Sequence, residues 1–185
     1  MTTFDAMRAL GEARGWKLDP PNPGILNLYS SVSLSGVESG VPIRLERVAG
    51  AELFTTLAAL DPPLPVQFAI THEGLVGTIA NFIGFHDVQV GDPTFDKAFR
   101  IVAKDATALK QLLTPELRHV LTKLHAESSP LGVRGFHVSE HGVSLSRSTS
   151  TALGDLSTPE QLLRDVPLTI AVVLALKQAS TKTHR

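Results

Sequence analysis

The sequence predicts an α+β fold, in which an antiparallel sheet of several hairpins packs with an N-terminal helix, a central helix pair and a C-terminal helix. Segments with an apolar residue at every second position occur in pairs joined by short polar loops, which is typical of hairpins. Segments with apolar residues three and four positions apart precede, interrupt and follow those pairs. Because the strands do not alternate regularly with helices, we do not expect a parallel α/β enzyme fold.

Length and composition predict one domain over residues 1–185, with a frayed polar tail at 180–185. A chain of this size buries roughly 70% of its unfolded surface, so it needs no disulfide or metal to fold. The absence of cysteine excludes disulfides, thiolate metal sites and a cysteine nucleophile. A formal net charge of −1, without a basic cluster, argues against nucleic acid as a partner.

The chain shows no targeting signal or membrane segment. Its first 16 residues include acidic side chains and lack the apolar core of a signal peptide. The longest apolar run, 166–176, is far shorter than the roughly 20 residues that span a bilayer. We therefore expect a cytoplasmic protein with no integral membrane segment.

The N-terminal region predicts a helix and then a hairpin. Residues 3–14 place Phe4, Met7 and Leu10 near one helical face, and a proline-rich connector follows. Residues 26–35 and 41–46 then alternate apolar and polar positions around a loop at 36–40. Pro42 indicates that the second of these strands begins late or lies at an edge of the sheet.

The next three segments differ in how strongly they favour one structure. Residues 51–60 permit either a helix or a strand, and we favour a strand because the neighbouring segments are β. After several prolines, residues 66–71 alternate as another strand. Residues 75–85 are apolar and glycine-spaced, and a short helix, a bulged strand and a loop all remain open.

The stretch from 85 to 124 predicts a strand at 88–90, a tight turn at 91–93, a second strand at 99–104 and two helices. Asp105 is a favourable N-cap for a short helix beginning at residue 106. Thr114 would cap a longer helix whose first residue is Pro115 and whose apolar stripe repeats every three or four positions.

Two motifs in this stretch resemble a bacterial domain of unknown function. They read GDPxFDxxFxI over 91–101 and LLTPELR over 112–118. The resemblance covers about 35 of the 185 residues, together with a looser likeness of the flanking hairpins. It implies a bacterial source but no catalytic residue, substrate or cofactor.

The C-terminal third predicts a second hairpin and a final helical region. Residues 136–145 form the hairpin around Glu140-His141-Gly142, and the Ser/Thr-rich stretch 146–155 is expected to be an exposed loop. Thr158-Pro159-Glu160-Gln161 is a capping box that opens a helix, which Pro167 should break or kink.

Residues 168–179 predict a helix that is apolar on nearly every side. Such a helix is either buried in its own protein or covered by a partner or a second copy. If charged substitutions at Val173 and Leu176 left both folding and oligomeric state unchanged, the idea of a dimer or partner would be wrong.

The candidate chemistry in the sequence is sparse. His137 and His141 could meet across the second hairpin, with His86 joining from another strand to hold zinc. No known ligand spacing supports that site, and we expect scattered surface histidines instead. Asp92 and Asp96 could form a carboxylate pair, but turn and capping roles fit them better, with Asp96 also able to pair with Lys97 or Arg100. The seven histidines are His72, His86, His119, His125, His137, His141 and His184.

No nucleophile elbow, Walker loop or dinucleotide-binding fingerprint is present in the sequence. We therefore expect no catalytic residue, no cofactor and no metal, and predict a non-enzymatic binding or scaffolding module that acts through a protein partner or as a homo-oligomer. The alternatives are a small metal-dependent hydrolase and a lipid- or apolar-ligand-binding domain, the latter with 75–85 lining its cleft.

Overall fold

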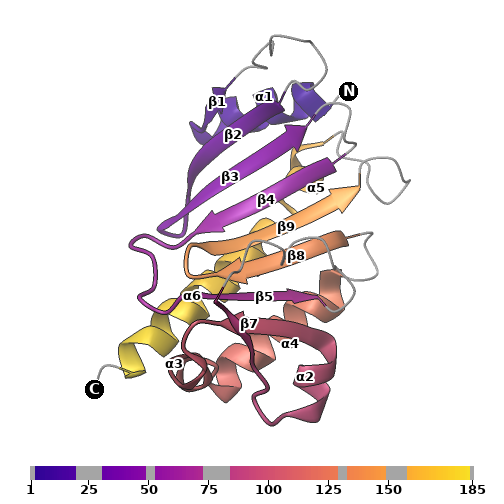
Figure 1. The fold of residues 1–185 in the computed structure, drawn as a ribbon. Coiled ribbons are helices and arrows are strands. Elements are labelled where there is room, and N and C mark those ends of the chain that lie inside the picture. Colours follow the sequence, from indigo (N-terminus) through magenta and orange to yellow (C-terminus); the bar gives the residue numbers. More distant parts are fainter. Residues whose placement is uncertain are drawn as a thin grey trace.

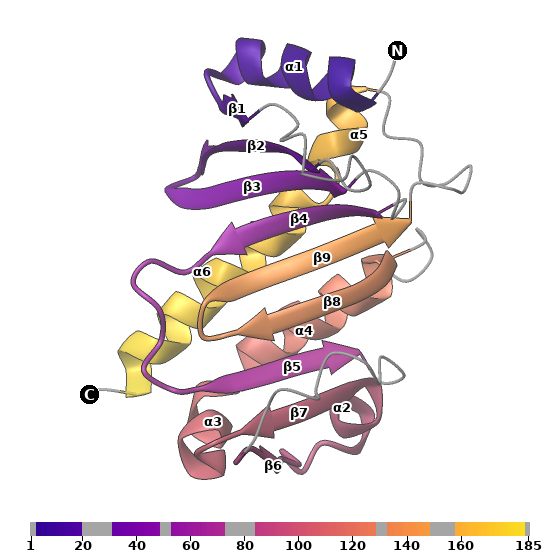
Figure 2. The same ribbon diagram turned by 45° about the horizontal axis from the view of Figure 1, so that its top comes forward.

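The computed structural model confirms an α+β fold built on one antiparallel sheet. It describes residues 3–19, 31–48, 53–72, 84–128, 133–148 and 158–183. Within these ranges the sheet has nine strands, and six helices accompany it (Figures 1 and 2). The region 73–83, which includes most of the segment whose conformation the sequence left open, lies outside the described residues.

The elements follow the chain in a simple order. The strands are β1 Lys17–Asp19, β2 Ser31–Glu38, β3 Val41–Val48, β4 Leu53–Ala59, β5 Phe68–His72, β6 His86–Asp87, β7 Phe99–Ala103, β8 Val133–Ser139 and β9 Gly142–Ser148. The helices are α1 Thr3–Arg14, α2 Pro93–Ala98, α3 Ala106–Leu112, α4 Pro115–Ser128, α5 Pro159–Leu163 and α6 Val166–Thr183.

The strand order joins distant parts of the chain. It runs β1-β2-β3-β4-β9-β8-β5-β7-β6, so β4 has β9 as a neighbour and β5 lies between β8 and β7. The N-terminal strands β1 to β4 form a meander, and the C-terminal hairpin β8–β9 extends it. Both edge strands of the described sheet are short: β1 pairs only with Ser33–Ser35 of β2, and β6 pairs only with Val102 and Ala103 of β7.

In Figure 2, α4, α5 and α6 lie behind the sheet, α1 lies along its β1 edge, and α2 and α3 lie beside β7. Cross-strand partners share a face, and one such row runs from Leu34 through Leu45, Thr56 and Leu145 to Phe136. Every side chain in this row is buried, because the helices cover it. The opposite face carries alternating polar positions and has no described helix over it.

Several predictions from the sequence are confirmed. The N-terminal helix spans the predicted residues 3–14, and the ambiguous segment 51–60 contains a strand, β4. The β8–β9 hairpin turns at Glu140 and His141 as expected. The caps of the central helix pair are also present, since Asp105 accepts the Thr107 and Ala108 amides and Thr114 accepts the Leu117 amide at 3.3 Å.

The first hairpin differs from the prediction in its turn and its position. Its loop is two residues long, Ser39 and Gly40, and both adopt the positive φ that a tight hairpin turn requires. β3 begins before Pro42 and lies inside the sheet, so the prediction of a late start or an edge was wrong. Pro42 is tolerated there because pairing with β4 starts only at Ile43.

Of the strand, turn and second strand predicted over 88–104, the first strand and the turn were wrong. The strand β6 is only two residues long and ends at Asp87, although the Val88 amide still donates to the Ile101 carbonyl at 2.9 Å. A short helix, α2, follows the turn, with Asp92 as its N-cap and Pro93 in its first turn. The Asp-Pro pair that we interpreted as a turn is therefore a helix start.

The C-terminal prediction was correct for the helices and wrong for the segment before them. The capping box of α5 is present, and Pro167 lies in the first turn of a new helix, α6, rather than inside a kinked one. Residues 146–148 continue β9 instead of forming an exposed loop, and Arg147 is almost fully buried there.

Candidate functional site

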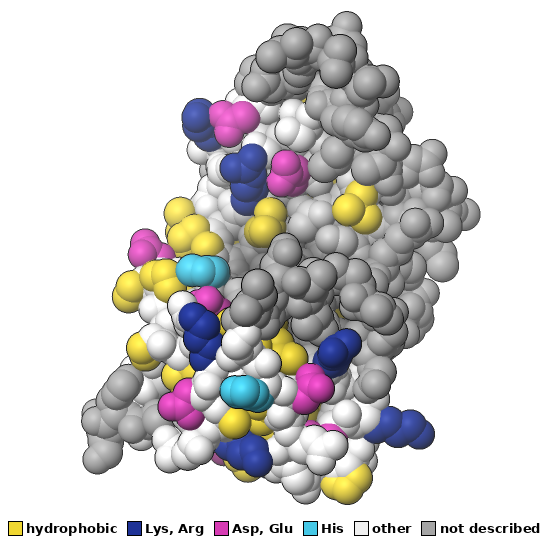
Figure 3. Space-filling model, viewed as in Figure 1, with side chains coloured by type: hydrophobic (Ala, Val, Ile, Leu, Met, Phe, Trp, Pro, Cys, Tyr) yellow, Lys and Arg dark blue, Asp and Glu magenta, His cyan; other side chains and the backbone are white. Residues whose placement is uncertain are grey.

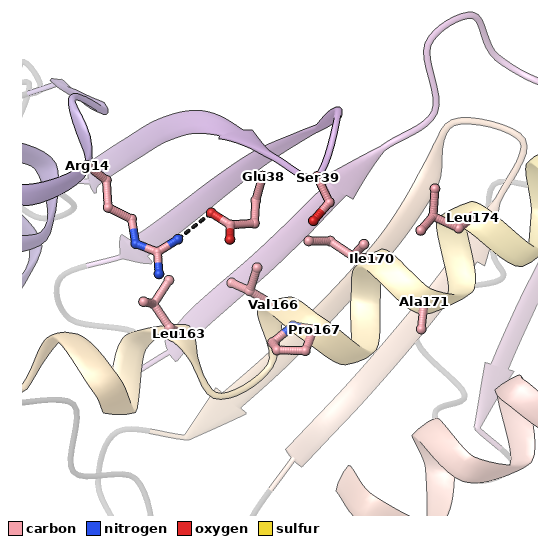
Figure 4. Close-up of a pocket in the computed structure, with 9 residues that line it drawn as sticks. All are labelled: Arg14, Glu38, Ser39, Leu163, Val166, Pro167, Ile170, Ala171 and Leu174. Atoms are coloured by element: carbon pink, nitrogen blue, oxygen red, sulfur yellow. Dashed lines mark hydrogen bonds and ion pairs between the residues drawn. The ribbon is translucent and has the colours of Figure 1, made fainter.

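A concavity of about 310 Å³ lies beside the C-terminal helix, and we call it the α6 groove (Figure 4). Its apolar wall comes from the end of α5 and the first half of α6. The polar wall comes from the end of α1 and the β2–β3 turn, through Arg14, Glu38 and Ser39. The apolar residues are Leu163, Val166, Pro167, Ile170, Ala171 and Leu174.

The helical period of α6 explains why one side is buried while another faces the groove. Val173 and Leu176 are fully buried and pack in the core beneath the sheet. Pro167, Ala171 and Leu174 lie on the opposite, exposed side, and Leu174 is 39% exposed. Val173 and Leu176 therefore belong to the chain's own core, which is the first of the two roles expected for a helix that is apolar on nearly every side.

The polar wall is held by an ion pair between α1 and β2. The guanidinium of Arg14 donates to the Glu38 carboxylate. The same guanidinium lies 5.8 Å from the centre of the Trp16 ring. Trp16 is buried, as expected, and its ring occupies the space over Gly36, where a Cβ would meet it at 2.3 Å.

The apolar wall is anchored by a buried ion pair. Arg147 on β9 donates from Nε and Nη2 to both carboxylate oxygens of Asp165, the residue before α6. The two side chains are 2% and 4% exposed. Because this bidentate contact fixes the start of α6 against the sheet, it also fixes the groove that α6 borders.

A second, smaller cleft of about 150 Å³ lies on the other face of the sheet, at the β8–β9 hairpin. His137 and His141 both line it, as the sequence suggested they could. Burial lowers the pKa of His137, while the nearby Glu140 carboxylate opposes that shift. His137 is therefore neutral at physiological pH.

His86 does not join the other two histidines. It lies on β6, which is separated from β8 by β5 and β7, a distance of roughly 14 Å at the usual strand spacing. Among the described residues, no group of three His, Cys, Asp or Glu side chains is arranged to hold a metal ion. Basic and acidic side chains are also interspersed on this face rather than gathered by sign (Figure 3).

The two carboxylates at 92 and 96 hold the backbone of their own loop. Asp92 accepts the Phe95 amide at 3.2 Å and pairs with Arg118 at 3.1 Å. Asp96 accepts the Val90 amide at 2.9 Å and the Gly91 amide at 3.0 Å, so of the two alternatives, capping and pairing with Lys97 or Arg100, its contacts are to backbone amides. Both carboxylates thus have structural contacts.

Comparison with known proteins returns nothing that describes this chain: no family model, no curated protein and no solved structure matches it. Within the described ranges, none of the helices combines the length and apolar character needed to cross a membrane.

The sequence alone could not reveal the α6 groove, because three separated segments form it. The sequence did carry one signal, the apolar character of α6: the positions that are exposed in the structure carry no charge before Lys182. Because α6 is apolar on nearly every side, a helical wheel drawn from the sequence does not show which apolar side is exposed and which is buried.

Proposed function

We propose that this chain is a non-enzymatic binding module that acts through protein–protein contacts, with the α6 groove as its docking site. The observation that carries the proposal is the exposed apolar stretch Pro167, Ala171 and Leu174 of α6, which borders a groove of about 310 Å³. Exposed apolar surface next to a concavity is typical of protein interaction sites.

The anchoring of the groove supports a docking role. Its two walls are each tied to the sheet by an ion pair, Arg14–Glu38 on one side and Arg147–Asp165 on the other. A preformed groove lowers the entropic cost of binding because little has to be ordered when the partner arrives. The proposal places the module in the cytoplasm, and the resemblance of its 91–118 segment to a bacterial domain suggests a bacterial source.

Photo-crosslinking tests the proposal. We would replace Ala171, which is exposed in the groove, with p-benzoylphenylalanine, and make the same replacement at Ala126 on the exposed side of α4 as the control. We expect a defined protein adduct at position 171 and not at position 126. The purified partner should then bind the Leu174→Glu variant at least tenfold more weakly, because the new charge would be buried in an apolar contact.

Two results would contradict the proposal. The first is the same set of adducts at both positions, which would reflect collision rather than docking. The second is unchanged affinity of the identified partner for Leu174→Glu, which would place its contact elsewhere on the molecule.

A small apolar ligand is the second candidate occupant, because the volume of the α6 groove falls within the range of known ligand sites. A groove of about 310 Å³ lies at the lower end of the roughly 300–1,000 Å³ range of ligand sites. Native mass spectrometry of the untagged protein would reveal a retained ligand as extra mass, and Leu174→Glu should abolish that mass.

A further inference from the structure

We propose that the α6 groove binds an acidic amphipathic helix of another protein, whose apolar side fills the groove and whose carboxylates lie at Arg164 and Lys177. The inference rests on the proposed function, since it gives the chemical class of the partner for the same docking site. It follows from the position and the pairing of the charged side chains around the groove.

Two basic side chains stand at the two ends of the groove, and we call them the end cations. Arg164 is exposed in the connector between α5 and α6, flanked by the groove residues Leu163 and Val166. Lys177 is half-buried and lies two helical turns after Ile170, on the same side of α6. From Val166 to Lys177 the helix rises about 17 Å, so the apolar floor is bounded at both ends by a positive charge.

The end cations differ from the other cations near the groove because they lack an acidic partner. Arg14 is paired with Glu38, and Arg147 with Asp165 (Figure 4 shows the first pair). Within the described residues, neither end cation forms an ion pair. Glu160 lies one turn before the first of them, but its lowered pKa comes from its own backbone amide and Thr158 rather than from a cation. The rim of the groove is therefore positive, on a chain whose formal net charge is −1.

This charge pattern selects an acidic partner. Carboxylates at both ends of a docked segment would be attracted to the end cations, whereas a basic segment would be repelled. A small apolar ligand could fill the floor but would leave both end cations without a contact, because they stand so far apart. A flat anionic membrane could reach the end cations but would leave the concavity between them unfilled.

The walls of the groove favour a helix over an extended segment. One wall consists of apolar side chains from α5 and α6, and the other comes from the end of α1 and the β2–β3 turn, not from an open edge of the sheet. An extended segment buried there would leave its backbone amides and carbonyls without partners, whereas a helix satisfies its own. The expected partner segment carries apolar residues three and four positions apart on one side, with acidic residues about three turns apart beside them.

Binding of two designed peptides to the full chain tests the inference. Both have about 16 residues, a fluorescent label and leucine every three or four positions, but one carries glutamate beside the leucines and the other carries lysine. By fluorescence anisotropy at 50 mM salt, we expect the acidic peptide to bind at least tenfold more tightly than the basic one. Raising the salt to 500 mM should weaken the binding of the acidic peptide, because salt screens exposed charges.

Substitution of the end cations supplies the matched comparison. Arg164→Gln/Lys177→Gln should weaken binding of the acidic peptide about three- to tenfold, as expected for the loss of two exposed ion pairs. The control, Arg44→Gln/Lys97→Gln, removes one exposed arginine and one exposed lysine from β3 and α2, and should change binding less than twofold. Leu174→Glu should weaken binding at least tenfold, because it places a charge in the apolar contact.

Three results would overturn the inference. They are equal binding of the two peptides, equal effects of the two double variants, and no binding of the acidic peptide up to 1 mM. Vesicles that contain anionic phospholipid provide a further comparison. Binding to the vesicles without binding to the acidic peptide would assign the end cations to a membrane surface, and the inference would be wrong.

The outcomes separate this inference from the proposed function. A photo-adduct specific to position 171, with a partner that binds Arg164→Gln/Lys177→Gln as tightly as the wild type, would show that the acidic class is wrong and that the binding module stands. The absence of both an adduct specific to position 171 and any peptide binding would remove both.

Discussion

The buried Arg147–Asp165 pair yields the sharpest test of how the structure is held together. We predict that Arg147→Met strongly destabilises the protein, because it leaves the Asp165 carboxylate buried at 4% exposure without its cation. The double variant Arg147→Met/Asp165→Leu should recover most of that loss, since two apolar side chains then replace two buried charges.

The magnitude follows from the geometry. For two unit charges about 4 Å apart, an effective dielectric constant of about 20 gives an attraction of roughly 4 kcal/mol. Removing one partner of a buried pair typically costs about 3–5 kcal/mol, whereas replacing both partners is often neutral. We therefore expect the single variant to lose about 3–5 kcal/mol and the double variant to lose less than about 1–2 kcal/mol.

Urea unfolding followed by circular dichroism and by Trp16 fluorescence measures the two single variants, Arg147→Met and Asp165→Leu, and the double variant. Trp16 is the sole tryptophan and is buried, so its emission reports on packing between α1 and β2. A single-variant loss below about 1 kcal/mol would refute the reasoning. So would a double variant whose loss equals the sum of the two single losses, because no coupling between the side chains would then exist.

Three further predictions concern packing and pH. Gly36→Ala should cost about 1–3 kcal/mol and shift Trp16 emission to the red, because a new Cβ would lie 2.3 Å from the indole ring, and equilibrium unfolding with emission spectra checks both. Leu176→Asp should cost at least the roughly 2–5 kcal/mol of a core truncation, whereas Leu174→Asp should leave unfolding nearly unchanged. Burial lowers the pKa of His137 in the folded state, so the unfolded chain binds a proton first as the pH falls below about 6.5. Stability present above that pH should then be lost as the pH falls further. Urea unfolding at a series of pH values should show that His137→Gln reduces this loss, while the control substitution His141→Gln at an exposed position does not.

Local sequence signals predicted most of the elements because those elements depend on neighbouring residues. The capping box at Thr158 and the N-cap at Asp105 involve groups within three positions, and both are present in the structure. Helix α2 was missed although its signals were there, because Gly91-Asp92-Pro93 is equally typical of a turn. The choice between the two depended on Phe95, which packs against Phe99 at a ring distance of 4.5 Å.

The candidate site could not be predicted because tertiary contacts decide it. Arg147 stands in a Ser/Thr-rich segment that resembles a loop, yet it continues the alternation of Val143 and Leu145 on the helix-covered face. Its burial depends on Asp165, which lies 18 positions later. The sequence likewise marked α6 as apolar but did not reveal which side the core would take.

The position of β9 in the sheet has a consequence for synthesis on the ribosome. Strands β2, β3 and β4 can pair as soon as they emerge, but the free edge of β4 is completed only by residues 142–148. Roughly 80 residues must be translated while that edge is open, which takes about 4–16 s at the usual rates. During that interval the backbone of β4 is available to other nascent chains, so cellular yield should depend on how fast translation reaches β9.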